Sequence, residues 1–586
     1  MNHMQAMAVG GCAATLHLPE GGRFRQLVLI CNSFGYEGLY VHRALAALGE
    51  DLAAAGMAAL RLDYPDQGDS VDLPPEADAV GAWLDSLRAA LAWARHRYPG
   101  VALSLCGYRL GALLAAEVAA QEPELCGLVL LSPVMSGRSY VRELKLSIGP
   151  NAAQAEVQGL SQEGWWLSAA SLQRLAGLDL KHLGAPARID VLALADSGTR
   201  ALEKWAAAFR ATAEEGASRP LCCEVHEAPE LLLLRDDSHA VTVPETGFAQ
   251  VVDWLRRRPA QPSRPAAEPD PAPLPAAWAV PGGVEQHLRY GPQKAFAAVW
   301  TRPDPDRGGG PCLLILNTGG NPRSGHNRLS VRLARALLQQ GVSTLRVDVS
   351  GTGDAWPVQR GRNQALYSGA PVADVGVALD WLEHQGHGRP AVLGLCSGAY
   401  LGFQAALAQE RVGSLLMVNS QSFLWHGRPF GEPVTEGAAA DQPVQLKHLD
   451  RYHRIVFTAD FWRRLWRREV RVWEVVSRLV GAHVFRLASA VQARLPGWLV
   501  LVPRAAAIQR HFAALLRRRL PLLLVYGDTD PGMNELQACF GPAGMRLARQ
   551  SGVSVQIVPG ADHTFTEPAS TDTLVRIVGE FVRHRA

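Results

Sequence analysis

The feature that most constrains this chain is a strand–turn–helix pattern that occurs twice, with a different residue at the tip of each turn. In the second half, an apolar run enters the turn 394–399, which reads Gly-Leu-Cys-Ser-Gly-Ala. In the first half, an apolar run enters the turn 107–112, which reads Gly-Tyr-Arg-Leu-Gly-Ala. Glycines two residues before and after the tip let neighbouring backbones approach closely. The tips are therefore Cys396 and Arg109, a thiol in one turn and a guanidinium in the other.

A proline-rich segment divides the chain into two parts. Residues 257–277 hold seven prolines in 21 positions, which disfavours a helix or a strand ladder and predicts an extended linker. A chain of 586 residues is also too long for one ordinary hydrophobic core. We therefore predict two domains, at residues 1–256 and 278–586, joined by this linker.

The two predicted domains repeat one another. Asp63 and Asp348 each precede a Gly-Asp pair, and they lie 285 residues apart, close to the 287 residues between the two turn tips. Asp196 and Asp530, each after a later apolar run, are 334 residues apart, so the second half carries an insertion of 47 residues, within about 421–520. Apolar strands alternate with amphipathic helices, which predicts the α/β class, with mostly parallel sheets covered by helices on both faces.

The second half holds candidates for a nucleophile, an acid and a base in that order. Cys396 stands at the turn tip, Asp528 and Asp530 follow a buried apolar run, and His563 follows the last one. A cysteine attacks as its thiolate, which an adjacent histidine stabilises as an ion pair. The histidine in turn needs a carboxylate to orient it, so this order is typical of a catalytic triad.

These motifs resemble the α/β-hydrolase fold across nearly the full length of the chain. A cysteine at the turn tip is similar to those of dienelactone hydrolases and of some thioesterases and acyltransferases. The resemblance implies that Asp530 is the acid, that His563 is the base and that the insertion forms a helical lid. Asp528 remains the alternative acid. Ser397 remains an alternative nucleophile to Cys396, although it is one residue out of register with the flanking glycines.

An acyl-transfer site also needs donors for the oxyanion. We expect the backbone N–H of Ser397 and one N–H from the glycine-containing loop 318–320, assigned to Gly320. The predicted function is hydrolysis or transfer of an ester or thioester acyl group, without a cofactor, and no Cys/His spacing predicts a metal site. The second half resembles proteins of bacterial polysaccharide or secondary-metabolite assembly. The alternative is a non-catalytic scaffold or carrier-binding module.

The first half has an acid and a base candidate but no nucleophile. Asp196 and His239 occupy those positions, while Arg109 stays protonated and cannot attack a carbonyl. The Gly-Tyr-Arg-Leu-Gly turn is similar to a hydrolase-like branch found with bacterial exosortase systems, which implies that arginine is usual in that branch. Two interpretations stay open: a pseudo-enzyme domain, or a pocket in which Arg109 and His239 bind a carboxylate or phosphate.

The predicted insertion is basic and rich in tryptophan. Residues 447–519 hold sixteen Lys and Arg against four Asp and Glu. Apolar residues at three- and four-residue steps across 461–479 predict an amphipathic helix. Three interpretations stay open: a lid packed over the site, a docking surface for an acidic carrier protein, or peripheral contact with an anionic membrane. No motif predicts binding of nucleic acid.

The remaining features point to a soluble cytoplasmic protein. The nine cysteines show no disulfide framework, and the net charge of +3 gives no argument for a polyanionic partner. The first ten residues lack the pattern of a signal peptide, and no apolar run approaches the roughly 20 residues that span a bilayer. We therefore expect reduced thiols.

Overall fold

The computed structural model describes residues 4–122, 124–148, 159–182, 189–214, 222–235, 241–258, 274–304, 309–361, 368–424 and 503–585. The chain forms two compact units. The first unit draws on residues 1–306, 320–339 and 345–363, and the second on residues 307–319, 340–344 and 364–586.

The first unit is built on an eight-stranded sheet in the order β1-β2-β4-β3-β5-β6-β9-β10. Strand β2 pairs antiparallel with both β1 and β4. Every other pair of neighbouring strands, from β4 to β10, is parallel. The strands are β1 (Met4–Val9), β2 (Cys12–His17), β3 (Gln26–Cys31), β4 (Ala58–Leu62), β5 (Ala102–Tyr108), β6 (Gly127–Leu131), β9 (Asp190–Ala195) and β10 (Cys223–Glu227).

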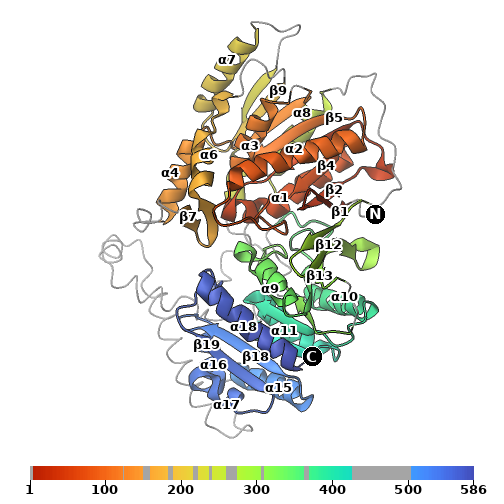
Figure 1. Cartoon of the computed structure of the whole chain (residues 1–586), viewed down its shortest axis with the longest axis vertical. Helices are drawn as coiled ribbons and strands as arrows, with labels where there is room; N and C mark the ends of the chain where they lie inside the picture. The colour runs from red at the N-terminus through yellow and green to blue at the C-terminus, as the bar shows by residue number, and fades with distance from the viewer. Residues whose placement is uncertain are drawn as a thin grey trace, which may run out of the picture. The chain divides into compact units, whose positions relative to one another are not determined.

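Helices cover both faces of this sheet (Figure 1). Helices α1 (Gly35–Ala54) and α8 (Glu245–Arg256) contribute to one hydrophobic core, while α2 (Ala79–Arg97) and α3 (Leu110–Ala119) contribute to another. Both faces of the sheet are therefore buried, which explains why its central parallel strands, such as β3 and β6, are mostly apolar rather than alternating.

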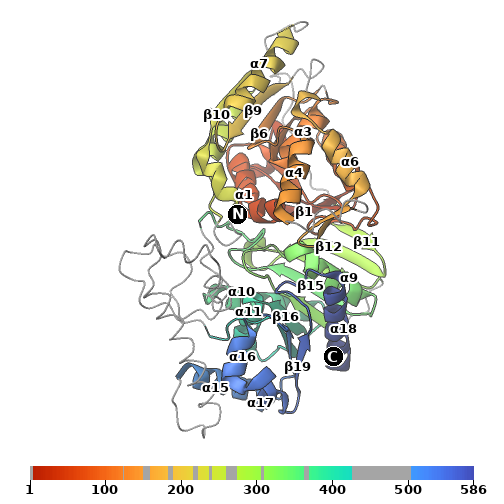
Figure 2. The same cartoon turned by 90° about the vertical axis from the view of Figure 1, so that its left-hand side faces the viewer.

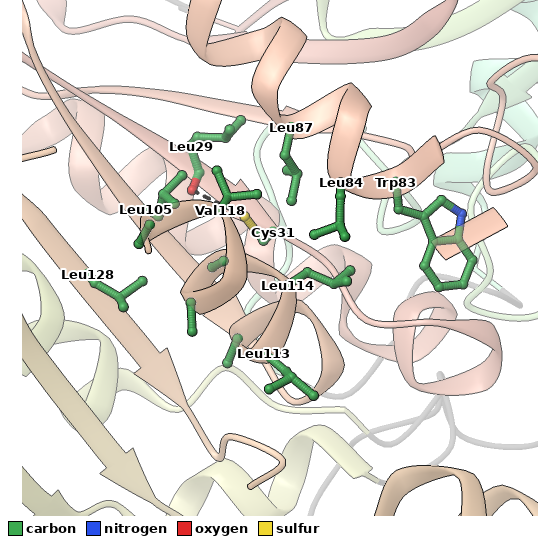
Figure 3. Close-up of a cluster of buried hydrophobic side chains, with 14 of the residues drawn as sticks. Leu29, Cys31, Trp83, Leu84, Leu87, Leu105, Leu113, Leu114, Val118 and Leu128 are labelled. Atoms are coloured by element: carbon green, nitrogen blue, oxygen red, sulfur yellow. Dashed lines mark hydrogen bonds between the residues drawn. The ribbon is translucent and has the colours of Figure 1, made fainter. Parts of the chain in front are cut away.

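Strand β3 shows how one strand supplies both cores. Leu29 and Cys31 belong to the core beneath α2 and α3, and Val28 and Ile30 belong to the core beneath α1 and α8. Side chains of successive residues point to opposite faces of a strand, so this division follows from the two-residue period. Figure 3 shows the first core, where Leu29 and Cys31 lie with leucines of α2 and α3.

Further elements complete the first unit. A small antiparallel sheet joins β7 (Gly159–Gln162) to β8 (Trp165–Ser168), beside helices α4 (Gly137–Ile148) and α6 (Ala169–Gly177).

Downstream strands occur in the order β11-β12-β13-β15, and the first three pair antiparallel. The other elements are α7 (Arg200–Glu214), β11 (Ala277–Val280), β12 (Gly283–Tyr290), β13 (Phe296–Arg302), α9 (Leu329–Leu338) and β15 (Ser343–Asp348), of which residues 345–348 lie in this unit.

The second unit holds five parallel strands in the order β14-β16-β17-β18-β19. They are β14 (Cys312–Ile315), β16 (Ala391–Leu395), β17 (Ser414–Val418), β18 (Leu522–Gly527) and β19 (Val553–Val558). The helices are α10 (Ala370–His384), α11 (Ser397–Ala408), α15 (Pro503–Arg517), α16 (Met533–Phe540), α17 (Met545–Ala548) and α18 (Pro568–Arg585). Helices α15, α16 and α17 lie side by side (Figure 2).

Short 3-10 turns join several of these elements. They are η1 (Glu20–Gly22), η3 (Leu180–His182), η4 (Pro229–Arg235), η5 (Pro292–Lys294), η6 (His326–Arg328) and η9 (Pro542–Gly544).

The predicted class of mostly parallel sheets covered by helices is confirmed. Most of the predicted insertion, at 425–502, and most of the predicted linker, at 259–273, lie outside the described residues. The domain boundaries drawn from the sequence therefore stay predictions, as do the lid and its basic amphipathic helix. Among the helices of the described ranges, none combines the length and the apolar character needed to cross a membrane.

Candidate active site

Cys396 occupies a sharp turn between β16 and α11. Its φ of 56° and ψ of −115° lie in a region that residues with a side chain rarely adopt. The flanking glycines are sterically required, because a Cβ on Gly394 would approach the Gly398 oxygen to 2.0 Å. A Cβ on Gly398 would approach the Asn317 oxygen to 2.4 Å. The Gly-x-Cys-x-Gly pattern is therefore the sequence that this turn needs.

The acid and base candidates meet at the ends of β18 and β19. The His563 Nδ1 atom lies 2.5 Å from the Asp530 Oδ2 atom. Asp530 is only 5% exposed, and its Oδ1 atom accepts a hydrogen bond of 2.7 Å from the Gly532 N–H. The alternative acid, Asp528, instead accepts a hydrogen bond from the Gly560 N–H at 3.1 Å. The structure thus brings Asp530, rather than Asp528, against His563.

His563 also lies against the cysteine. Burial lowers the pKa of His563, but this effect is outweighed by hydrogen bonds to the side chains of Asp530 and Cys396 and by the charges of both. Together they raise the pKa of His563 to about 10. A positively charged imidazole is therefore favoured between the Asp530 carboxylate and the Cys396 sulfur. Cys396 is itself partly exposed.

The hydroxyl of Ser397, the alternative nucleophile, is bonded to the loop after β14. Ser397 is 5% exposed, and its Oγ atom accepts a hydrogen bond of 2.7 Å from the Gly319 N–H. This bond ties the loop after β14 to the beginning of α11. The Ser397 side chain thus holds this loop in place. Its backbone N–H belongs to the first residue of α11, directly after Cys396. Gly320, the other candidate donor, is the next residue of this loop and is assigned to the first unit.

Two polar residues after β17 were missed by the sequence reasoning. Asn419 is fully buried; its Nδ2 atom donates to the carbonyl oxygens of His563 at 2.8 Å and Asp562 at 3.3 Å. Its Oδ1 atom accepts from the Gly527 N–H at 2.9 Å. The Gln421 Nε2 atom lies 3.3 Å from both ring nitrogens of His563. The available signal was their position directly after a buried parallel strand, where binding residues gather.

The turn in the first half repeats the same backbone geometry. Arg109 has φ 51° and ψ −113°, within a few degrees of Cys396. Its N–H donates to the Leu131 oxygen at 2.9 Å, just as the Cys396 N–H donates to the Val418 oxygen at 2.9 Å. A Cβ on Gly107 would approach the backbone of the following helix to within 2.5 Å. The two turns therefore differ in side chain and not in backbone.

Arg109 is held by carboxylates of its own domain. Its guanidinium contacts Glu37 at 2.8 Å and Glu143 at 2.6 Å. The hydroxyls of Ser33 and Tyr140 donate to the second oxygen of Glu37, at 2.7 Å and 3.0 Å. A carboxylate or phosphate ligand at Arg109 would have to compete with these internal partners.

The acid position of the first half is also paired with a cation. Asp196 forms an ion pair of 2.6 Å with Arg235. His239, the predicted base or ligand-binding residue, lies outside the described residues. Within the described ranges, no cluster of three or more His, Cys, Asp or Glu has the arrangement of a metal site.

Family models match both halves of the chain. Residues 8–172 match a model described as serine aminopeptidase S33, and residues 313–576 match one described as the alpha/beta hydrolase family. No curated protein matches the chain. The two family matches and the observed architecture show two α/β-hydrolase folds in tandem, so the predicted fold class is confirmed. The branches suggested by resemblance stay predictions.

Several solved structures resemble one part of the chain. Est1E from Butyrivibrio proteoclasticus, solved with ferulic acid, has 17% identity and a TM-score of 0.34, over 43% of this chain and 98% of its own. A dienelactone hydrolase from Anabaena variabilis has 15% identity and a TM-score of 0.31, over 51% of this chain and 97% of its own. The protein TT1662 from Thermus thermophilus has 19% identity and a TM-score of 0.29, over 43% and 97%.

Proposed function

We propose that the second half transfers an acyl group from an ester or thioester through a covalent acyl-enzyme on Cys396. One observation carries the proposal: Cys396, His563 and Asp530, from three different strand ends, form a hydrogen-bonded series. A cysteine on such a turn, paired with a charged imidazole, has the thiolate that attack on a carbonyl requires. The family match supports a hydrolase-type reaction.

The reaction is proposed in two steps. The Cys396 sulfur bonds to the carbonyl carbon, the carbonyl oxygen becomes an oxyanion, and backbone N–H groups of Ser397 and Gly320 stabilise it. The bond to the leaving alcohol or thiol then breaks, and His563 gives that group its proton. In the second step His563 takes a proton from water or from an acceptor alcohol or amine, which attacks the acyl-enzyme and releases Cys396. Asp530 orients the imidazole and stabilises its charge.

The direct test is intact-protein mass after brief exposure to a panel of acyl thioesters and activated esters. The wild type should gain one acyl mass, Cys396→Ala should gain none, and Ser397→Ala should still gain one. An adduct that survives in Cys396→Ala would refute the cysteine mechanism. The adduct's lifetime with and without added amines or alcohols separates transfer from hydrolysis. Adding a carrier protein or anionic vesicles to the same acylation assay tests whether either one is a partner of the basic insertion.

For the first half we propose a non-catalytic role, as a pseudo-hydrolase domain. The proposal is supported by the pairing of Arg109 with Glu37 and Glu143, and of Asp196 with Arg235. The ligand-binding interpretation is tested by comparing substrate affinity between the wild type and Arg109→Ala. Equal affinities would remove Arg109 from substrate binding.

A further inference from the structure

Glu535, in the first turn of α16, is a buried carboxylate that joins two other segments of the second unit to this helix. Its side chain belongs to a residue that is only 5% exposed. The Glu535 Oε1 atom accepts from the Arg504 Nε atom at 2.9 Å and from the Arg504 Nη2 atom at 2.6 Å. The Oε2 atom accepts from the Phe423 N–H at 2.9 Å. The carboxylate thus fastens the beginning of α15 and the chain after β17 to α16.

Arg504 also binds the chain after β17 directly. Its Nη2 atom donates to the Ser422 Oγ atom at 2.9 Å and to the Leu424 oxygen at 2.8 Å. A guanidinium can serve a carboxylate and neighbouring oxygens at the same time, because its donors form a fixed planar fork. These five residues are here called the Glu535 cluster: Ser422, Phe423, Leu424, Arg504 and Glu535.

The Glu535 cluster is adjacent in sequence to two side chains that contact His563. Asp530 precedes Glu535 by five residues, and its carbonyl oxygen accepts from the Met533 N–H at 3.1 Å, so the turn that carries the acid leads directly into α16. Gln421 directly precedes Ser422, and its Nε2 atom lies 3.3 Å from both ring nitrogens of His563. The cluster therefore links Gln421 to the helix that begins at the acid turn.

Asp530 and Gln421 restrain different movements of the imidazole. Asp530 meets the Nδ1 atom at the edge of the ring, at 2.5 Å. The Gln421 nitrogen lies over a face of the ring, because in the ring plane an atom 3.3 Å from both nitrogens would overlap the ring carbons. The edge contact alone leaves the ring free to tilt, and the face contact opposes that tilt. With Nδ1 held by Asp530, the His563 Nε2 atom is the one left for the Cys396 sulfur.

From these contacts we infer that Glu535 and Arg504 are positioning residues for His563, which act by holding Gln421 against the face of its ring. The inference rests on the proposed acyl transfer at Cys396. In that reaction the imidazole stabilises the thiolate and then gives a proton to the leaving group, so a tilted ring weakens both functions. Proton transfer by a positioned side chain contributes about 10²–10⁴-fold to a rate.

Alkylation of Cys396 by iodoacetamide tests the position of the imidazole without any acyl transfer. Its rate is measured across pH on the full-length chain by peptide mass spectrometry. A histidine close to the sulfur stabilises the thiolate and lowers the pKa of the thiol. In Glu535→Gln, Arg504→Lys and Gln421→Ala we expect the lower inflection of the pH profile to rise by about one pH unit, so that alkylation below the inflection slows about ten-fold.

Two esters with the same acyl group test the proton transfer. The p-nitrophenolate ion leaves without a proton, whereas trifluoroethoxide is a stronger base and leaves readily only as the alcohol. In the three variants we expect the ratio of acylation rates, p-nitrophenyl butyrate over trifluoroethyl butyrate, to rise about ten-fold or more. A substitution that merely lowers the amount of folded protein would leave both this ratio and the inflection unchanged.

Gln509→Ala is the matched control. The Gln509 Nε2 atom donates to the Cys539 oxygen at 2.8 Å, so it joins the same two helices, α15 and α16, without involving the chain after β17. Both readouts should match the wild type. The double variant Glu535→Gln/Gln421→Ala tests the route: if Glu535 acts through Gln421, the double variant should be no more impaired than Gln421→Ala alone.

The outcomes are distinct. A wild-type inflection and ratio in folded Glu535→Gln and Arg504→Lys overturn the inference, as does wild-type behaviour of Gln421→Ala, which keeps the test available if a cluster variant does not fold. Effects that multiply in the double variant also overturn it, because Glu535 would then act by another route. A wild type that is alkylated but acylated by no thioester or activated ester refutes the proposed function itself, while the alkylation profiles still decide how His563 is held.

Discussion

The buried amide of Asn419 offers the sharpest test of how the second unit holds its site. Asn419 bonds two backbone segments at once. One is at Gly527, the last residue of β18, shortly before Asp530; the other is at His563, in the loop after β19, here called the base loop. Asn419→Ala removes these two bonds and leaves the buried Gly527 N–H and the partly buried His563 C=O without this partner. Each such group costs about 1–3 kcal/mol, so the two well-formed bonds together predict a loss of about 2–6 kcal/mol in the free energy of unfolding.

Two buried thiols allow the loss to be assigned to one unit. Cys539 is buried in the second unit and Cys106 in the first, so pulse labelling at increasing urea concentration reports each unit separately. With an m-value of about 1–3 kcal/mol per molar urea, Asn419→Ala should lower the midpoint for Cys539 by on the order of 1 M. The midpoint for Cys106 serves as the internal reference and should stay in place.

The same substitution should slow acylation of Cys396. Releasing the base loop lets His563 move, and a displacement of about 1 Å costs roughly 10²-fold in rate. Asn419→Asp keeps the acceptor for Gly527 but loses the donor for His563, so it should retain part of the stability while losing the rate. A Cys539 midpoint that is unchanged in Asn419→Ala would refute the reasoning, because the two bonds would then contribute nothing.

Three further predictions follow from the geometry. Asp530→Asn removes the largest of the contributions that raise the pKa of His563, so the upper inflection in the pH profile of Cys396 alkylation should fall below about 10; an unchanged inflection would contradict this. Arg109→Ser should not create a second acylation site, because Asp196 stays paired with Arg235; a second acyl mass that persists in the Cys396→Ala background would show otherwise. Gly353→Ala would place a Cβ 2.3 Å from the Asp348 carboxylate at a φ of +48°, so it should lower the melting temperature, as should Gly68→Ala beside Asp63.

The sequence predicted those parts of the site that depend on local spacing. The turn at Cys396 could be identified because its two required glycines lie only four residues apart in the chain. A Cβ added at Gly394 or Gly398 would come within 2.0 or 2.4 Å of a backbone oxygen. The aspartate loops were visible for the same reason: Asp63 accepts from the Asp69 N–H and Asp348 from the Asp354 N–H, each over six residues.

Contacts between distant residues could not be predicted in this way. Glu37 neutralises Arg109 across 72 residues, and no local pattern marks Glu37 as its partner. The Arg61–Asp354 pair joins residues 293 apart. Their equivalents in the other repeat are Arg346 and Asp69, each 285 residues away, but a repeat alone does not say that each copy binds the other. Such pairing depends on how folded elements meet, which single-chain periodicity does not contain.

The two turns together show that the backbone of this motif does not decide whether it is catalytic. Arg109 and Cys396 share their dihedral angles and the same hydrogen bond to the neighbouring strand. What differs is the charge that surrounds each tip: carboxylates pair with the cation at Arg109, whereas the raised pKa of His563 favours an imidazolium beside Cys396, which in the proposed mechanism stabilises a thiolate. A nucleophile is made by that surrounding charge, so one fold can hold a reactive thiolate in one repeat and an ion pair in the other.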